Sequence, residues 1–227
     1  AWDGRTPAAR AAPPGCYTAR ILLRDTLGRT NFTTRLVRVD ALTADPSVLA
    51  DTTRGPKYPH ARGHWAVWQD QGDGFWQVYA QELGANPAPV RQLTAGTLSQ
   101  ENPRTDGRRV VWQGRQINAS WDLFLQDLAS ADPPQQLTFT PNHDETSPAL
   151  DWPWLVFQSR ATADTAAPWL VHARYLPTGE TRVVSPSTAD QLAPDVHAGQ
   201  GVWQDFRNVG YGDIFYRNTL ASGVVPQ

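Results

Sequence analysis

GHWAVWQD, at residues 63–70, is the stretch that decides the fold, because the chain repeats it three more times with small changes. The later copies are RVVWQ at 109–113, WLVFQ at 154–158 and GVWQD at 201–205. Their aromatic residues before the glutamine stand 44, 45 and 46 positions apart along the chain. An internal repeat of this length is typical of propellers and solenoids, in which one unit buries its apolar face against the next copy.

Each copy contains the same succession of short apolar stretches separated by turn residues. A proline opens the copy, at Pro59, Pro103, Pro148 and Pro194, and proline at the first residue of a strand removes no ladder hydrogen bond. A turn, the aromatic–glutamine stretch, a polar loop and a second apolar stretch follow, and a triplet such as QLT at 136–138 closes the copy. Four short strands per copy without a helical period predict one blade of a β-propeller.

The composition of the 227-residue chain excludes several classes of function. A net charge of -2 argues against a nucleic-acid-binding surface, which normally carries a basic excess. No apolar run approaches the roughly 18 residues that a membrane span needs, so we expect a water-soluble chain without a transmembrane segment. Cys16 is the single cysteine, which leaves no internal disulfide and no cysteine-based metal site.

Methionine is absent from the sequence, including from position 1. We therefore expect a processed product or a piece of a longer chain, and an exported protein that has lost a signal peptide fits this expectation. The ten tryptophans, 19 prolines and 17 glycines agree with many short strands joined by turns.

Residues 1–39 differ from the repeats and predict two strands joined by a hairpin. WDGR stands at 2–5, PPGCY at 13–17, and RDTLGRT at 24–30 separates two strand-like stretches. This order resembles the C-terminal half of the immunoglobulin-like module of bacterial flagellar-hook-cap-type and cell-surface proteins. The resemblance implies a partial immunoglobulin-like β segment, whose missing strands leave open edges for pairing with another chain or with the neighbouring domain.

The repeats contain, in this order, a proline, D-G, W-Q-D, D-I-F-Y and Q-L-T. This order of motifs is similar to the TolB-like, WD40-like (PD40) β-propeller repeat of bacterial envelope proteins. The resemblance covers residues 59–223 and is strongest over 201–220. It implies an all-β fold with four TolB-like blades after a linker at 40–58. The propeller is assigned to residues 59–227, and its four blades to residues 59–102, 103–147, 148–193 and 194–227.

Two arrangements of the four blades are open at this point. The last copy lacks a clear outer strand, and RLVRVDALT at 35–43 ends in the Leu-Thr that closes the other outer strands. This segment, or residues 47–49 of the linker, would supply the missing strand and close the ring. The alternative is a partial ring, an open arc that another chain completes.

The repeated aromatics are interpreted as framework residues that pack between blades, because a large ring at the same place in every copy fits a shared core. They are Trp68, Trp112, Phe157 and Trp203. The glutamine that follows each of them recurs as well, and we expect its amide to satisfy backbone groups of a neighbouring strand.

Loop arginines follow three of these aromatics, at Arg115, Arg160 and Arg207, and should share one face of the ring. Arginines in such loops commonly pair with local carboxylates, here for example Asp205. A set of arginines on one face also fits an acidic protein partner. These three are the predicted partner-binding residues.

No catalytic, cofactor-binding or metal-binding residue is predicted. The five histidines form no H-E-x-x-H group, the DQGDG stretch at 70–74 lacks the ligand series of a calcium loop, and neither a G-x-S-x-G elbow nor a phosphate loop occurs. A cluster around His143, Asp144 and Glu145 would need residues of another blade. The sequence therefore predicts a protein that is not an enzyme and needs no cofactor.

The resemblance favours a non-catalytic interaction or scaffold module of the bacterial cell envelope, periplasmic or extracellular, although function from fold is only an associational argument. Its partners would be other envelope or membrane-complex proteins, and one version is an accessory subunit of a larger membrane-associated complex. The alternative is a carbohydrate-binding or polysaccharide-lyase propeller, with Trp76, Trp121 and Trp169 stacked on sugar rings. These tryptophans align at the start of the second apolar stretch, which favours a structural role.

Overall fold

The structure is a computed structural model that describes residues 15–24, 30–39, 49, 55–72, 74–84, 89–117, 120–208 and 211–217. The chain is divided into two compact units, Ala1–Leu49 and Ala50–Gln227. Strands, turns and loops make up the described residues, and no helix among them is able to cross a membrane. The predicted all-β fold is confirmed.

The first unit contains one antiparallel pair of strands, β1 (Gly15–Arg24) and β2 (Thr30–Val39), in a sheet of two strands. All positions of the two strands are paired with one another, as the sequence predicted. Many β folds contain such a pair, so the immunoglobulin-like assignment stays a prediction. Residues 35–39 of the suggested ring-closing segment pair with β1, and 40–48 lie outside the described residues; ring closure likewise stays a prediction.

The second unit consists of four antiparallel sheets that follow one another along the chain. The first two contain β3 (Lys57–Arg62), β4 (Trp65–Gly72), β5 (Phe75–Glu82) and β6 (Arg91–Gln92), then β7 (Gln100–Thr105), β8 (Arg109–Arg115), β9 (Trp121–Asp127) and β10 (Gln135–Gln136). The last two contain β11 (His143–Asp151), β12 (Trp154–Ala161), β13 (Leu170–Tyr175) and β14 (Glu180–Val183), then β15 (Gln191–His197), β16 (Gln200–Asp205) and β17 (Asp213–Arg217). We call these sheets blades 1 to 4. Strands pair in chain order within each blade, which is the meander of a propeller blade.

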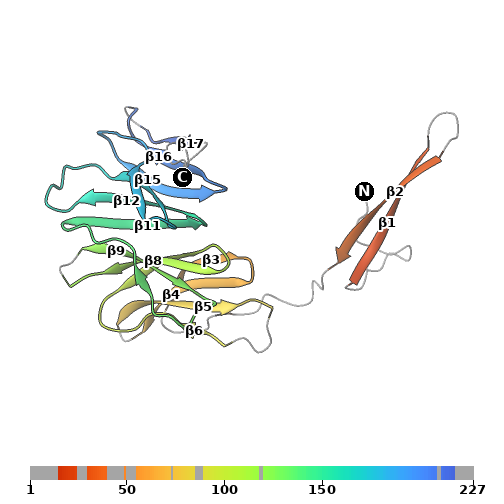
Figure 1. The fold of residues 1–227 in the computed structure, drawn as a ribbon, viewed down its shortest axis with the longest axis horizontal. Coiled ribbons are helices and arrows are strands. Elements are labelled where there is room, and N and C mark those ends of the chain that lie inside the picture. Colours follow the sequence, from red (N-terminus) through yellow and green to blue (C-terminus); the bar gives the residue numbers. More distant parts are fainter. Residues whose placement is uncertain are drawn as a thin grey trace. The chain divides into compact units, whose positions relative to one another are not determined.

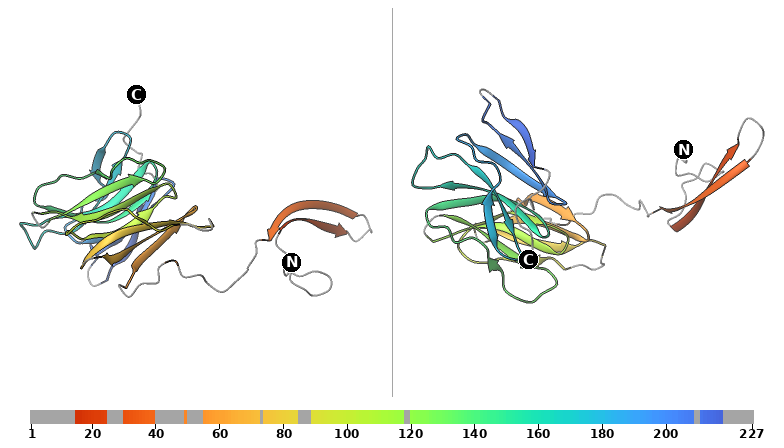
Figure 2. Two further views of the ribbon diagram at one scale, coloured as in Figure 1. Left: turned by 90° about the horizontal axis from the view of Figure 1, so that it is seen from below. Right: turned by 45° about the horizontal axis from the view of Figure 1, so that its top comes forward.

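The blades lie face to face in chain order, from blade 1 at the bottom of Figure 1 to blade 4 at the top. The right-hand view of Figure 2 shows the same succession. Three apolar clusters fill the spaces between blades, and each joins aliphatic residues of one blade to the repeated aromatic of the next. The central trios are Val67, Val78 and Trp112; Val111, Leu123 and Phe157; and Val156, Val171 and Trp203. The core of the unit is therefore divided into equivalent layers.

Each repeated aromatic also faces a ring on the neighbouring strand of its own blade. The pairs are Trp68 with Tyr79, Trp112 with Phe124, Phe157 with His172, and Trp203 with Phe215, with ring centroids 6.2, 6.1, 5.4 and 6.3 Å apart. The two residues of each pair are direct cross-strand partners, so the four blades share one register. Ring pairs of this kind contribute roughly 0.5–1.5 kcal/mol beyond their burial.

The residue before each opening proline has a left-handed backbone. The φ angles lie between 49° and 56°, at Tyr58 (52°), Asn102 (56°), Ser147 (52°) and Ala193 (49°). Each of these residues stands at a break in the register of the first strand of its blade. A left-handed conformation costs a residue other than glycine on the order of 1 kcal/mol or more, so neighbouring groups must hold it in place.

The repeated glutamine supplies that support across the gap between blades. Its side-chain oxygen accepts a hydrogen bond from the backbone N–H of the left-handed residue in the next blade. The bonds run from Asn102 to Gln69 (2.8 Å), from Ser147 to Gln113 (2.9 Å) and from Ala193 to Gln158 (3.2 Å). One amide thus fixes the first strand of the following blade, which explains why glutamine recurs with the aromatic.

Replacing Gln113 by alanine is expected to lower the free energy of unfolding by about 1–2 kcal/mol, because the N–H of Ser147 loses its acceptor between two blades. Gln204 has the same position in blade 4, and the described residues place no following blade beside it. Gln204→Ala is therefore the matched control, with an expected loss below about 0.5 kcal/mol. Urea unfolding measures both values, and equal losses would mean that the glutamine acts only within its own blade.

Candidate functional site

The loops between the second and third strands gather at one edge of the second unit, because the blades share one strand order and register. We call this edge the loop face. The three arginines predicted to bind a partner all lie at it: Arg115 ends β8, Arg160 lies near the end of β12, and Arg207 follows β16.

Cations on the loop face cover the tryptophans considered for sugar stacking. The pairs are Lys57 over Trp76 (5.1 Å from the cation to the ring centroid), Arg115 over Trp121 (5.2 Å) and Arg160 over Trp169 (4.6 Å). A cation above an aromatic face is held there by the ring quadrupole. One face of each half-buried tryptophan is thus already in use, which fits a framework role and leaves less ring surface for a glycan.

Arg207 is held by the fully buried carboxylate of Asp205. Its guanidinium donates two hydrogen bonds to Asp205, at 2.9 and 2.7 Å, and another to the hydroxyl of Ser185 at 2.6 Å. Asp205 also accepts the indole N–H of Trp203 at 3.0 Å and the amide of Gln191 at 2.8 Å. These bonds, first those from Arg207, hold the pKa of Asp205 well below its usual range. Arg207 is therefore engaged by blade 4 and by the connection between β14 and β15 that precedes it.

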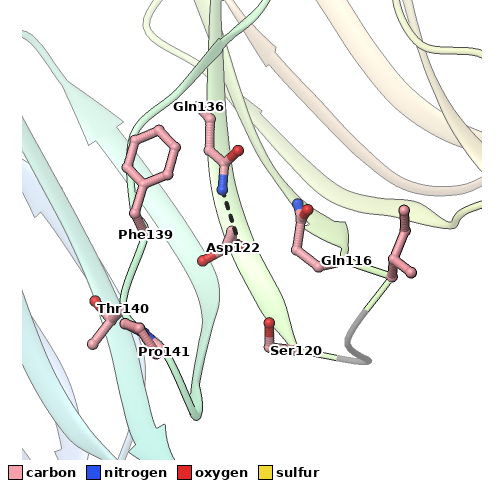
Figure 3. Close-up of a pocket in the computed structure, with 8 residues that line it drawn as sticks. Gln116, Ser120, Asp122, Gln136, Phe139, Thr140 and Pro141 are labelled. Atoms are coloured by element: carbon pink, nitrogen blue, oxygen red, sulfur yellow. Dashed lines mark hydrogen bonds between the residues drawn. The ribbon is translucent and has the colours of Figure 1, made fainter.

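A pocket of about 500 Å³ opens on the loop face of blade 2 (Figure 3). It is lined by Gln116, Ile117, Ser120, Asp122, Gln136, Phe139, Thr140 and Pro141. Ile117 and Phe139 are apolar but 94% and 70% exposed. Figure 3 shows Phe139, Thr140 and Pro141 on one side, Gln116 and Ser120 on the other, and Asp122 with Gln136 between them. The pocket therefore combines exposed apolar side chains with a polar floor.

The QLT motif fixes the wall of the pocket that carries Phe139. The hydroxyl of Thr138 accepts the backbone N–H of Leu123 at 2.8 Å, and the Gln136 amide donates to the Thr138 carbonyl at 2.9 Å. The same amide also donates to Asp122 at 3.0 Å, which forms the floor. Because the motif anchors the chain immediately before Phe139, that side chain leaves a rigid part of the blade.

Two carboxyl groups meet beneath the pocket, Asp122 from β9 and the buried Glu145 from β11. Burial, and then the neighbouring Asp122, raises the pKa of Glu145 to about 8. Burial also raises the pKa of Asp122. At neutral pH Glu145 is therefore protonated and donates its proton in a hydrogen bond to Asp122. Glutamine occupies the position of Glu145 in blades 2 and 4, at Gln100 and Gln191, so a neutral side chain is the rule there.

A second pocket of about 500 Å³ lies between blades 2 and 3 and shares Gln136, Phe139 and Thr140 with the first. Glu145, His143 and His172 contribute to its lining. Burial lowers the pKa of His172, so its ring is neutral at pH 7. Across the residues that the structure describes, no three histidine, cysteine or acidic side chains come together as a metal site.

The first strands of all four blades line a smaller cavity of about 250 Å³. At its mouth, Arg62 of blade 1 forms an ion pair with Asp151 of blade 3 at 2.6 Å and a hydrogen bond with His197 of blade 4 at 3.1 Å. The His60 ring, which also lines the cavity, accepts the backbone N–H of Thr105 at 3.2 Å, and burial lowers the pKa of His60. The charged groups at this mouth thus compensate one another across the blades.

The pocket on blade 2 was not predicted from the sequence. A signal for it exists, because Ile117 and Phe139 are single apolar residues within otherwise polar loops. That both residues line one pocket follows only from the packing of two connections that are separate in the sequence. The same holds for Asp122 and Glu145, which belong to different blades.

No protein-family description and no curated protein matches the sequence. Several solved structures do match the chain. A puromycin-hydrolysing peptidase of Mycobacterium tuberculosis matches 90% of this chain at 10% identity with a TM-score of 0.60, over 34% of its own length. The β-propeller domain of the Trilobed protease of Pyrococcus furiosus, described as having an open velcro topology, matches 88% at 11% identity with a TM-score of 0.55, over 63% of its length.

A putative TolB of Agrobacterium tumefaciens matches 77% of the chain at 12% identity, with a TM-score of 0.50, over 65% of its length. The chain therefore spans between a third and two thirds of these proteins. At such identities the likeness establishes the fold alone. The fold is all-β, with blades of the β-propeller type as the repeats predicted.

Proposed function

We propose that the chain is a non-catalytic protein-interaction module of the bacterial cell envelope, an accessory part of a larger membrane-associated assembly, and that its loop-face pocket binds the partner. The observation that carries the proposal is the exposure of Ile117 and Phe139, two apolar residues that both line that pocket. The envelope location rests on the resemblance of the repeats to those of envelope proteins.

The chemistry of the pocket supports a protein partner. Exposed apolar side chains around a concavity are a common feature of interaction sites, and most of the binding energy comes from a few anchors that lose water completely. An apolar side chain of the partner would fill the space between Ile117 and Phe139. A donor on the partner would reach Asp122, whose carboxylate forms the polar floor.

Arg115 supports the same proposal from the rim of the pocket, since it directly precedes Gln116. Arg160, in the next blade, adds a second positive charge on the loop face. Charges at a rim act mainly on the rate of association and on its dependence on salt. We therefore assign Arg115 and Arg160 to steering an acidic partner surface, with the apolar anchors holding it.

The wild-type chain is expected to capture a stoichiometric protein partner from a mild-detergent extract of source-organism envelopes. The double variant Ile117→Ser/Phe139→Ser is expected to capture at least tenfold less of that partner. The loss follows because both anchors of the pocket are removed, while the melting temperature should stay within about 1–2 °C since both side chains are exposed. Capture followed by quantitative mass spectrometry gives the first value and thermal unfolding the second.

Tyr211→Ser is the matched control, because Tyr211 is an exposed aromatic in the β16–β17 loop, away from the pocket. It should capture the partner as the wild type does. Recovery of the wild-type chain alone, or equal capture by the double variant, would contradict the proposal.

A further inference from the structure

The second pocket, between blades 2 and 3, contains an arginine without a carboxylate partner. We call it the inter-blade pocket. Arg174 of β13 lines it, and among the described residues the one hydrogen-bond partner of its guanidinium is the hydroxyl of Thr181, at 3.1 Å. Its Nε is buried and has no acceptor there. Burial lowers the pKa of Arg174. A half-buried cation whose charge is not compensated favours an anion as its missing partner.

We propose that the inter-blade pocket binds a small carboxylate that also carries hydroxyl groups, either a hydroxy acid or a sugar acid. Its volume of about 500 Å³ lies within the range of small-molecule sites. The proposal depends neither on the protein partner proposed above nor on the tryptophans considered for sugar stacking.

The other blades show that the framework does not require Arg174. The equivalent position, two residues after the ring partner of the repeated aromatic, is glutamine in blades 1 and 2, at Gln81 and Gln126. In blade 4 it is Arg217, which donates to the backbone carbonyl of Val184 in blade 3 at 2.5 Å and so ties two blades together. Within the described part of the chain, Arg174 makes no such bond to blade 2, so its charge is available to a ligand.

His172 supplies a hydrogen-bond acceptor beside that cation. Its Nδ1 lies 3.1 Å from the backbone carbonyl of Leu170, which can only accept, so Nδ1 carries the proton of the neutral ring and Nε2 keeps its lone pair. The ring still stacks on Phe157, with centroids 5.4 Å apart. Because His172 and Arg174 are two residues apart, they lie on the same face of β13. A ligand hydroxyl would donate to Nε2 while the carboxylate meets Arg174.

The rest of the lining adds no negative charge at pH 7. Glu145 is the one carboxyl group among the lining residues, and it is protonated at this pH, so it does not repel an anion. The hydroxyls of Thr140, Ser159 and Thr181 both donate and accept hydrogen bonds. Phe139 adds an apolar wall at the exposed rim. One arginine among several hydroxyls matches a ligand with one negative charge and several hydroxyls of its own.

The test is calorimetric titration of the full chain at pH 7 with two hydroxylated carboxylates, gluconate and glycerate. At least one of them should bind with a Kd below about 1 mM. Sorbitol, which has hydroxyls like those of gluconate but no carboxylate, should bind at least tenfold more weakly. Tighter binding of gluconate would identify a sugar acid as the ligand, and tighter binding of glycerate a hydroxy acid.

Two variants locate the binding in the inter-blade pocket. Arg174→Gln should weaken it at least tenfold, and His172→Phe about three- to tenfold, the range for one hydrogen bond. Both variants introduce a residue that other blades have at the same position, so the melting temperature should stay within about 2 °C. Arg182→Gln is the matched control, because it removes the same charge from the opposite face of blade 3, beside Trp154. It should bind as the wild type does.

The proposal is wrong if neither acid binds, if sorbitol binds equally well, or if binding survives Arg174→Gln. Inorganic phosphate that binds more tightly than both acids would overturn it as well, since the pocket would then select a phosphate group. If one of the two variants fails to fold, the other decides the result. The titration uses the purified chain without a partner, so its outcome is independent of the capture experiment on the loop-face pocket.

Discussion

Asp205→Ala is expected to lower the free energy of unfolding by about 3–5 kcal/mol, the range for breaking a buried charge pair. The carboxylate is fully buried and accepts hydrogen bonds from Arg207, Trp203 and Gln191. Its removal leaves the indole N–H and the glutamine amide without their acceptor inside the blade, and it releases the arginine that ties the loop to β16. Urea or thermal unfolding at pH 7 measures the loss.

The matched control for this variant is Asp127→Ala. Asp127 forms one ion pair with Arg108 at 2.8 Å, and that arginine side chain is mostly exposed, so a loss of at most about 1 kcal/mol is expected. Comparable losses for the two aspartates would show that burial and the hydrogen-bond network of Asp205 do not determine its contribution.

The Asp205 network also has a predictable dependence on acid. Because the pKa of Asp205 is lowered in the folded state, the folded chain binds the proton less tightly than the unfolded chain. The contribution of Asp205 to stability is therefore present above the ordinary aspartate range and is lost as the pH falls below it. The Asp205→Ala variant should thus approach the wild type in stability at strongly acidic pH.

The repeats made most of the architecture predictable, because they impose the same physical requirement in every copy. The aromatic before each glutamine had to be large and apolar to fill the space between sheets, and Trp112, for example, is almost wholly buried there. The glutamine had to satisfy a backbone group, and Gln113 accepts the N–H of Ser147. Both requirements are local to one position of the repeat, so the spacing alone revealed them.

The candidate site could not be read from the repeats, because it depends on what differs between blades. Phe139 follows a QLT motif whose counterpart in blade 1 is followed by Ala95 and Gly96. Glu145 replaces a glutamine and meets Asp122 only after blades 2 and 3 have packed. The exposure of Val202 and Ile214 in blade 4 was equally hidden, since both match the apolar pattern of the buried copies in the other blades.

The wild-type chain is expected to lose stability as the pH rises from about 5 to 8, and the Glu145→Gln variant is expected not to show this loss. The pKa of Glu145 is raised from 4.5 to about 8 in the folded state, so the folded chain binds this proton more tightly than the unfolded chain. Its stabilising effect is complete below the unfolded pKa and is lost as the pH rises through the folded one. The difference across this window is on the order of 3–5 kcal/mol.

Glutamine keeps the shape of Glu145 and can still donate to Asp122, so Glu145→Gln should equal the wild type near pH 5 and exceed it in stability at pH 9. Chemical unfolding at pH 5, 7 and 9 gives the two curves, and Glu180→Gln, at an exposed position of β14, should follow the wild type throughout. Parallel curves for wild type and Glu145→Gln would mean that Glu145 is ionised at neutral pH. In that case the floor of the loop-face pocket would carry two negative charges instead of one, and the partner's donor opposite Asp122 would have to be a cation.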